Sequence, residues 1–201
     1  MSEKYLVFTG RPNSGKSSII REITGLDVAT GKHPGTTRSI SKYSLSDDLV
    51  LVDMPGFGRM MGVSKRLAGR MLNRIIDFLE SNAQDIVLIV HVLDISTFQE
   101  VTRRLEKKGL ISLDAEMVGF HAKTLGEFPL VAANKIDKVD EKKIKVSLEE
   151  FVHLTSDEHL ANISDRIYPV SAKTGEGIGS LKNAIHERLA AKGYRTPFRT
   201  H

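Results

Sequence analysis

The sequence predicts an α/β fold with a mostly parallel sheet, one antiparallel edge strand and helices on both faces. Two observations lead to this class. Apolar runs of strand length alternate with stretches in which apolar residues return every three or four positions. A glycine-rich loop of phosphate-binding pattern also separates the first apolar run from the first helical stretch. Such alternation is typical of a parallel sheet with right-handed crossovers, and 201 residues suit one domain of this class.

The first part of the chain gives three strands and one helix. Lys4–Thr9 is apolar and leads into the glycine loop, after which Gly15–Thr24 is compatible with a helix. The next stretch, 25–38, is rich in glycine, proline and threonine, which predicts a loop. Ile40–Leu45 and Leu49–Asp53 are strands joined by three polar residues, so we expect a hairpin and hence the antiparallel edge.

The remainder of the chain continues the alternation. Val63–Asn82 is predicted to be a helix with an apolar face that comprises Leu67, Met71, Ile75 and Leu79. Ile86–Leu93 is almost continuously apolar, as expected for a parallel strand that is covered on both sides. The other predicted elements are helices at Thr97–Lys108, Leu113–Phe128, Glu141–Leu154 and Ile178–Lys192, and strands at Pro129–Ala133 and Arg166–Val170. We expect one domain over residues 1–192 and a loosely held basic tail over 193–201.

Composition excludes several classes of protein. The chain has no cysteine, so a disulfide framework, a thiolate zinc site and a thiol nucleophile are excluded. The first residues show no export pattern, and the longest apolar run, Ile86–Val90, is far shorter than a membrane span. We therefore expect a cytoplasmic protein with no membrane partner. The net charge of +4 favours, weakly, nucleic acid or an RNA-rich particle as partner.

The phosphate loop is the most informative motif, because it fits the pattern G-x-x-x-x-G-K-[ST] between a strand and a helix. Its glycines let the backbone wrap around an anion, toward which the amides of the helix N-terminus point. Lys16 can reach the β- and γ-phosphates, and the Ser17 hydroxyl can hold Mg²⁺. The predicted phosphate-binding residues are Gly10, Asn13, Ser14, Gly15, Lys16, Ser17, Ser18 and, from a later loop, Gly56. The alternative is an ordinary Gly/Ser turn before a helix.

Two further segments suit a bound triphosphate. Asp53 and Gly56 form a D-x-x-G motif after a strand, in which the carboxylate can hold Mg²⁺ and the glycine amide can donate to the γ-phosphate. Thr36 and Thr37 lie in the long loop, where a threonine can contact both Mg²⁺ and the γ-phosphate, as in a switch I segment. The predicted magnesium ligands are Ser17, Thr37 and Asp53. Taken alone, each segment is also a common turn or loop.

Two loops after the last strands are predicted to read the base. In the N-K-x-D motif, Asp137 can accept hydrogen bonds from N1–H and N2–H₂ of guanine, a donor pair that adenine lacks. Asn134 can tie this loop to the phosphate loop, and the stem of Lys135 can cover the base. In the S-A-K motif, a backbone amide can reach guanine O6 and Lys173 can cover the other face. The predicted guanine-binding residues are Asn134, Lys135, Asp137, Ser171, Ala172 and Lys173.

Together these segments resemble the five G motifs of small P-loop GTPases over nearly the whole chain. Two motifs are similar to the TrmE–Era–EngA–YihA–septin branch, namely the phosphate loop and Pro34-Gly35-Thr36-Thr37-Arg38. Two others are similar to the EngB/YihA family within that branch, namely Asp53-Met54-Pro55-Gly56-Phe57-Gly58 and Asp114-Ala115-Glu116-Met117. The resemblance implies a G domain of EngB type that binds GTP and GDP with Mg²⁺. It also implies slow GTP hydrolysis and the role of a nucleotide switch in assembly of the large ribosomal subunit.

The resemblance further implies partners and catalytic roles. We expect a monomer that contacts a ribosomal precursor or rRNA, and no DNA. The residues carried over as catalytic are Lys16, Thr37 and Gly56. The charged stretch Asp94–Leu113 is longer than the corresponding loop of the family, so its role stays open.

Hydrolysis is expected to be slow without a partner. Ras-type enzymes orient the attacking water with a glutamine, but Phe57 occupies that position here. Unaided Ras sets a scale on the order of 10⁻⁴ per second. Asn13 matches the asparagine with which TrmE-like proteins hold K⁺ near the phosphates; it either holds K⁺ here or only shapes the loop.

For several basic and polar residues the sequence allows a functional role and a purely structural one. One helical face holds Arg66, Arg70 and Arg74, which either dock on RNA phosphates in one nucleotide state or form a solvated face. A second cluster, read as soluble surface, comprises Lys138, Lys142, Lys143 and Lys145. The tail residues Arg195, Arg199 and His201 either reach RNA or form a disordered end. His91 lies inside an apolar strand and is predicted to be a hydrogen-bonded core residue rather than a ligand.

Three other functions stay open. An ATP-using P-loop kinase shares the phosphate loop, but Asp137 counts against it. A binding module would hold guanine nucleotide with negligible turnover. A Ras-type signalling switch would have a non-ribosomal partner, but the missing glutamine and the absence of a C-terminal cysteine for prenylation count against it.

Overall fold

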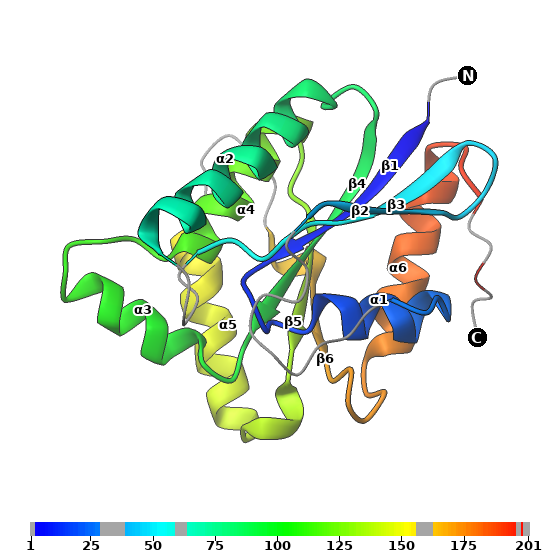
Figure 1. Cartoon of the computed structure of the whole chain (residues 1–201). Coiled ribbons are helices and arrows are strands. Elements are labelled where there is room, and N and C mark those ends of the chain that lie inside the picture. The colour runs from blue at the N-terminus through cyan, green and yellow to red at the C-terminus, as the bar shows by residue number, and fades with distance from the viewer. Residues whose placement is uncertain (1–2, 29–38, 59–63, 156–162, 196–197, 199–201) are drawn as a thin grey trace.

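Six strands form one mixed sheet in the order β2-β3-β1-β4-β5-β6 (Figure 1). β2 is antiparallel to β3, whereas the other neighbouring pairs are parallel. The predicted fold class is therefore confirmed, including the antiparallel edge strand. The computed structural model describes residues 3–28, 39–58, 64–155, 163–195 and 198, with the backbone alone of Lys65.

The strands and helices follow the predicted order, with most ends displaced by one or two residues. The strands are β1 (Lys4–Gly10), β2 (Ser41–Ser44), β3 (Leu49–Asp53), β4 (Ile86–Asp94), β5 (Leu130–Asn134) and β6 (Ile167–Val170). The helices are α1 (Lys16–Thr24), α2 (Lys65–Ser81), α3 (Phe98–Glu106), α4 (Leu113–Leu125), α5 (Glu141–Thr155) and α6 (Ile178–Ala191). Two 3-10 turns are η1 (Ile136–Lys138) and η2 (Ile163–Arg166).

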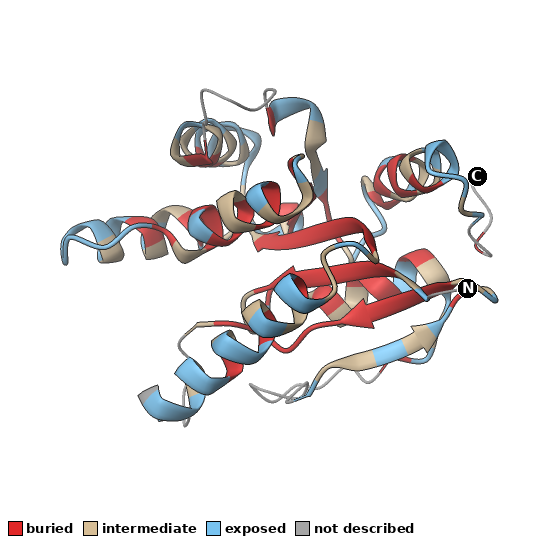
Figure 2. Cartoon of the chain, turned by 90° about the horizontal axis from the view of Figure 1, so that it is seen from above, coloured by how far each residue is buried: buried red, intermediate tan, exposed pale blue. Residues whose placement is uncertain are grey.

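Apolar side chains cover both faces of the sheet. Leu6 and Phe8 of β1 pack with α1 and α6, whereas the alternate residues Tyr5 and Val7 pack with α2 and α4 on the other face. A third cluster lies under α3, α4 and α5. Figure 2 shows the central strands buried along their length, with helices that bury only the side toward the sheet. This two-sided cover explains why β4 is apolar at almost every position.

Two predicted details of the helices are wrong. Helix α4 ends at Leu125 because Gly126 has a φ of 71°, a left-handed conformation that terminates helices, so α4 does not extend to Phe128. On α2, the predicted apolar face is buried at Met71, Ile75 and Leu79, but Leu67 is 39% exposed. The first turn of α2 therefore lies beyond the region that packs on the sheet.

One residue of the predicted tail, Phe198, packs more closely than the sequence predicts. Phe198 is buried and belongs to the cluster beneath α1 and α6. The ammonium of Lys182 lies 5.9 Å from the centroid of its ring. The expectation of a loosely held tail is thus wrong at Phe198, whereas Arg199 and His201 lie outside the described residues. Within the described part of the chain, no helix is both long and apolar enough to cross a membrane.

The parallel strands end at one edge of the sheet, which positions the polar motifs. β1, β3, β4, β5 and β6 run in the same direction. Phe8 of β1 is in register with Asp53 of β3, and Asp94 of β4 is in register with Asn134 of β5. Ligands of such sheets bind beyond the carboxyl ends of the strands, and that is where the predicted site residues lie.

Candidate functional site

The loop between β1 and α1 is wound tightly around Lys16. Its Nζ donates hydrogen bonds to the carbonyl oxygens of Gly10 and Arg11, both at 3.2 Å. Gly10 and Gly15 have φ values of 144° and 97°, which side chains rarely allow. A Cβ atom on Gly15 would lie 2.2 Å from Nδ2 of Asn134, and one on Gly10 would lie 2.3 Å from a backbone oxygen of β4. Glycine is therefore required at both positions by conformation and by space.

Lys16 and Asp53 are buried, and burial disfavours the charged form of each side chain. Burial lowers the pKa of Lys16 to about 8, although Asp53 and Asp114 act to raise it. Burial likewise raises the pKa of Asp53, against the opposing effects of Lys16 and the Ser17 hydroxyl. An anion beside the lysine and a cation beside the carboxylate would each relieve the cost that burial imposes.

Ser17 and Asp53 present oxygen atoms that suit a magnesium ion. The Ser17 hydroxyl donates to Oδ2 of Asp53 at 3.1 Å. The other carboxylate oxygen, Oδ1, is buried and has no hydrogen-bond partner among the described residues. Because hydroxyl and carboxylate oxygens are ligands that Mg²⁺ prefers, these two residues fit the predicted set. The remaining member, Thr37, lies with Thr36 outside the described residues.

The D-x-x-G glycine packs directly on the phosphate loop. A Cβ atom on Gly56 would lie 2.6 Å from the backbone nitrogen of Pro12, so only glycine allows this approach. The next residue, Phe57, is fully buried in the apolar cluster beneath α2 and α4. Its ring centroid lies 5.8 Å from that of His91. Phe57 is thus a core residue in the place where Ras-type enzymes carry a water-orienting glutamine.

Asn134 joins three loops of the site. Its Nδ2 donates to the carbonyl oxygen of Ser14 at 2.8 Å, and its Oδ1 accepts from the amide of Ala172 at 3.1 Å. The predicted tie between the N-K-x-D loop and the phosphate loop is therefore present. Within the base-reading loops, the Ser171 hydroxyl donates to Oδ1 of Asp137 at 2.7 Å and accepts from the amide of Lys173 at 3.3 Å.

The phosphate loop, the N-K-x-D loop and the S-A-K loop line one pocket. Its volume is about 350 Å³, within the range of small-molecule sites. The lining residues are Gly15, Ser18, Arg21, Asn134, Lys135, Asp137, Lys138, Ala172 and Lys173. Arg21 and Lys138 were not predicted for this site, and no motif marks them.

Lys135 has partners on two neighbouring elements. Its Nζ donates to the carbonyl oxygen of Asn13 and forms an ion pair with Asp94 at the end of β4. Sequence reasoning missed Asp94 as a site residue. The sequence feature that could have indicated Asp94 is its position directly after an apolar strand; the structure adds that it is in register with Asn134.

A buried polar cluster lies beside the phosphate loop. The ring of His91 lies 3.3 Å, through Nε2, from Oδ1 of Asp114 and 3.3 Å, through Nδ1, from the hydroxyl of Thr9. The same hydroxyl lies 2.9 Å from Nε2 of His121, and Arg11 of the phosphate loop lies 3.8 Å from Oδ2 of Asp114. Burial, with a smaller contribution from His91, holds the pKa of His121 well below its ordinary value. The prediction of a hydrogen-bonded core histidine at position 91 is confirmed.

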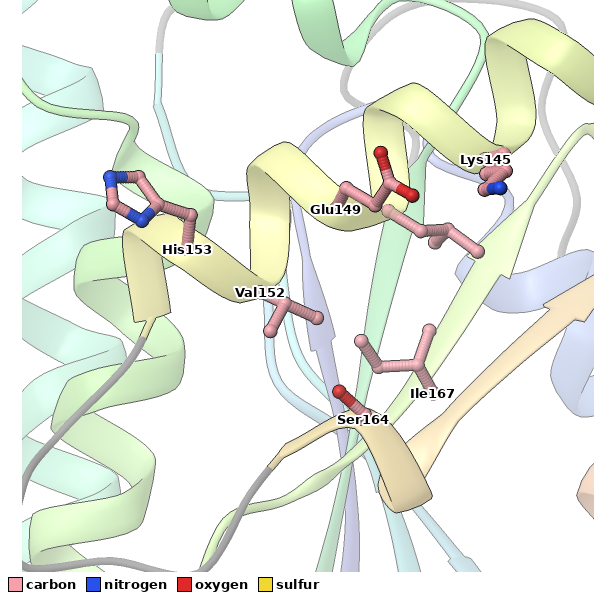
Figure 3. A pocket seen from close by; sticks show the side chains of 7 residues that line it. Lys145, Glu149, Val152, His153, Ser164 and Ile167 are labelled. Carbon is pink, nitrogen blue, oxygen red and sulfur yellow. The ribbon is translucent and has the colours of Figure 1, made fainter.

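A second pocket, of about 520 Å³, lies elsewhere, between α5 and the segment that leads into β6 (Figure 3). Its lining residues are Lys145, Leu148, Glu149, Val152, His153, Ser164 and Ile167. Figure 3 shows Val152 and Ile167 turned toward each other, whereas His153 extends away from them. It shares no lining residue with the pocket beside the phosphate loop.

Known proteins are similar to this chain in sequence and in fold. A family described as "50S ribosome-binding GTPase" matches residues 5–135. The "Probable GTP-binding protein EngB" of Methanopyrus kandleri is 41% identical over 197 residues, which cover 94% of each chain. A crystal structure of a probable GTP-binding protein engB has a TM-score of 0.81 and 34% identity, and the match covers 93% of this chain and 99% of that one. Era bound to MgGDPNP and nucleotides 1506–1542 of 16S ribosomal RNA shares the fold, with a TM-score of 0.58 and 21% identity over 92% of this chain and 56% of Era.

Proposed function

Because the chain belongs to the EngB family of GTP-binding proteins and is a GTPase, we propose that it acts as a slow nucleotide switch in assembly of the large ribosomal subunit. The observation that carries the nucleotide part is the side chain of Asn134, which joins the phosphate loop to the two loops around Asp137. The ribosomal part rests on the family description, which names 50S binding.

We propose that Asp137 selects guanine. The Ser171 hydroxyl holds Oδ1 of the carboxylate at 2.7 Å and so fixes the plane of the group. The carboxylate then accepts from N1–H and N2–H₂ of guanine, and adenine would leave it unpaired. Lys135 and Lys173 cover the two faces of the base, while a backbone amide of the S-A-K loop meets O6. Asn134 keeps these loops at a fixed distance from the phosphates.

Phosphate binding is assigned to the loop around Lys16. In the described structure its ammonium donates to two carbonyls of its own loop, which GTP oxygens would replace as acceptors. The backbone amides of the loop and of the α1 N-terminus add donors. The residues proposed to bind phosphate are Gly10, Asn13, Ser14, Gly15, Lys16, Ser17, Ser18 and Gly56. Those proposed to stabilise the γ-phosphoryl group during transfer are Lys16, Gly56 and Thr37.

Two cations are part of the proposal. Ser17, Asp53 and Thr37 would hold Mg²⁺, which when bound neutralises charge on the β- and γ-phosphate oxygens. The buried, unpartnered Oδ1 of Asp53 supports this assignment. Asn13 is the proposed K⁺ ligand; its φ of 62° and exposed side chain leave its amide available at the rim of the loop. Equal rates of hydrolysis in KCl and NaCl at matched ionic strength would discard the potassium assignment.

Turnover is proposed to be slow because Phe57, the residue after Gly56, replaces the glutamine that orients the attacking water in Ras-type enzymes. Phe57 cannot accept or donate the needed hydrogen bond, and its ring is buried. The same observation favours a second candidate function, a guanine-nucleotide binding module with negligible turnover. A single-turnover assay with and without ribosomal subunits separates the two, because only a switch is accelerated by its partner.

The remaining expectations concern the molecule as a whole. We propose a cytoplasmic monomer whose G domain spans residues 1–192, with a ribosomal precursor or rRNA as partner rather than DNA or a membrane. Phe198 packs against this domain, so the tail contributes to its core. A signalling role with a non-ribosomal partner is the alternative.

Two measurements test the proposal. GTP and GDP should displace a labelled guanine nucleotide at far lower concentration than ATP. The variant Asp137→Asn should bind xanthine nucleotides in preference to guanine nucleotides, because the C2 carbonyl of xanthine accepts a hydrogen bond from the new amide. The protein should also co-sediment with large ribosomal subunits in one nucleotide state. Equal displacement by ATP and GTP would refute the first part, and absence from the subunit fraction in every nucleotide state would refute the second.

A further inference from the structure

A basic hollow lies between α3 and α5, which lie side by side (Figure 1). Its volume is about 450 Å³, and its lining residues are Gln99, Glu100, Arg103, Arg104, Lys107 and Lys143. Four of these six side chains are cationic and one is anionic, which leaves a net charge of +3 on the lining. α3 belongs to the charged stretch Asp94–Leu113 and contributes no residue to the lining of the nucleotide pocket.

Three of the four cations lack an acidic partner. Arg104 is paired with Glu100 one turn away on the same helix. Arg103, Lys107 and Lys143 are exposed. The charged nitrogens of these three side chains form no ion pair within the described part of the chain, although Oδ1 of Asp140 accepts from the backbone amide of Lys143 at 2.7 Å. Uncompensated cations that converge on a hollow concentrate the field there and attract anions. The hollow therefore favours a ligand with several negative charges.

Helix α3 is held firmly on α5, so the spacing of these cations is defined. Phe98 of α3 is buried, and its ring lies 5.5 Å from that of Phe151 in an edge-on contact. Gln99 donates to Glu150 of α5 at 3.2 Å. Cations from two separately anchored elements can therefore contact successive phosphates without first ordering a flexible segment.

We propose that the α3–α5 hollow is a docking surface for the phosphate backbone of ribosomal RNA. This inference rests on the proposed ribosomal function and assigns the surface that would serve it. Arginine and lysine are the residues that neutralise RNA phosphates, and such contacts dominate affinity and its salt dependence. The hollow shares no residue with the nucleotide pocket, so RNA and nucleotide bind at the same time.

The test compares two variants with the same loss of charge. The first replaces the unpaired cations of the hollow, Arg103→Gln, Lys107→Gln and Lys143→Gln. The matched control replaces the stripe on α2, Arg66→Gln, Arg70→Gln and Arg74→Gln. The probe is purified large-subunit ribosomal RNA, titrated over a range of salt concentrations. GDP affinity and thermal unfolding of both variants should equal those of the wild type, which shows that both fold.

The hollow variant should bind RNA on the order of 100-fold more weakly at 0.1 M salt, because each lost phosphate contact removes about 0.7 from the slope of log K against log salt. Its slope should be shallower by about 2 for three contacts, and the α2 variant should keep the wild-type slope. That combination supports the inference.

Other outcomes overturn it in distinguishable ways. Equal losses in both variants would mean that only net charge matters, and a loss confined to the α2 variant would place the contact there. Polyglutamate that competes as well as RNA would indicate an acidic protein partner. A loss caused by Leu110→Ser with Ile111→Ser, at side chains that are 54% and 60% exposed, would indicate an apolar contact. A wild-type protein that binds neither ribosomal RNA nor ribosomal subunits would refute the proposed function itself.

Discussion

Nδ2 of Asn134 donates a hydrogen bond to the carbonyl oxygen of Ser14 at 2.8 Å, across 120 residues of sequence. Both residues are buried. Because Oδ1 of the same side chain accepts from Ala172, one amide group fixes the phosphate loop relative to both loops that are proposed to read the base. The site is therefore organised by hydrogen bonds of the protein itself, and nucleotide would enter a cleft whose walls already hold their spacing.

Asn134→Ala should weaken nucleotide binding mainly because it releases the loops that Asn134 holds together. The change leaves the Ser14 carbonyl and the Ala172 amide without their partner, at a cost of about 1–3 kcal/mol for each buried group. Only part of this cost is expected to appear as weaker binding, so GDP affinity should fall roughly 10- to 100-fold, which is about 1.4–2.8 kcal/mol at 1.4 kcal/mol per factor of ten. The measurement is calorimetric titration with GDP. Asn183→Ala is the matched control, because Asn183 lies on α6 and its Oδ1 has no partner among the described residues. An unchanged affinity in the first variant would contradict the organising role.

The sequence assigns candidate site residues wherever the proposed chemistry follows from spacing along the chain. The phosphate loop and the N-K-x-D loop are contiguous motifs, so Lys16 and Asp137 could be placed without the fold. Asp94 and Asp114 were missed as site residues because their roles come from register and packing. Asp94 meets Lys135 only because β4 and β5 are neighbours in the sheet.

The same distinction applies to the fold. Apolar alternation predicted the six strands and the edge hairpin, since these patterns are local. The exposure of Leu67 and the burial of Phe198 could not be predicted, because each depends on how far a neighbouring element reaches. Phe57 illustrates both kinds of property. The sequence alone shows that it replaces the glutamine of Ras-type enzymes, whereas its packing against His91 depends on the tertiary structure.

Nucleotide affinity should fall as pH rises above about 8. Burial sets the pKa of Lys16 near that value in the free protein, and bound phosphates raise it because they stabilise the ammonium. The complex therefore keeps a proton that the free protein loses, so affinity is constant below pH 8 and declines above it, by at most tenfold per pH unit. Calorimetric titration with GDP at a series of pH values checks this decline in affinity. Repeating the titrations in buffers of different ionisation enthalpy measures the proton uptake. Affinity that rises with pH over the same range would contradict the assignment of Lys16.

Asp114→Asn should move the pH dependence to lower pH. Asp114 lies near Arg11 and His91 and acts to raise the pKa of Lys16, so removal of its charge lowers that pKa further. We expect the midpoint of the affinity decline to shift below 8 and the free energy of unfolding to fall by about 1–3 kcal/mol, as the buried cluster loses a charged acceptor. Glu116→Gln is the control, because Glu116 is an exposed acid on the same helix. Identical midpoints in Asp114→Asn and the wild type would exclude this electrostatic coupling.

Phe57→Gln should not convert the protein into a fast GTPase, although it introduces the residue that Ras-type enzymes use at this position. The side chain at position 57 is fully buried in an apolar cluster, so glutamine would lose apolar contacts and bury an amide group. We expect the free energy of unfolding to fall by about 3 kcal/mol and single-turnover hydrolysis to stay at the wild-type rate. Phe57→Leu, which keeps an apolar side chain, should be less destabilised and hydrolyse equally slowly. Faster hydrolysis in Phe57→Gln at unchanged stability would mean that the glutamine side chain reaches the attacking water. Slow turnover of the wild type would then follow from the identity of residue 57 alone and not from the way the loop after β3 packs on the core.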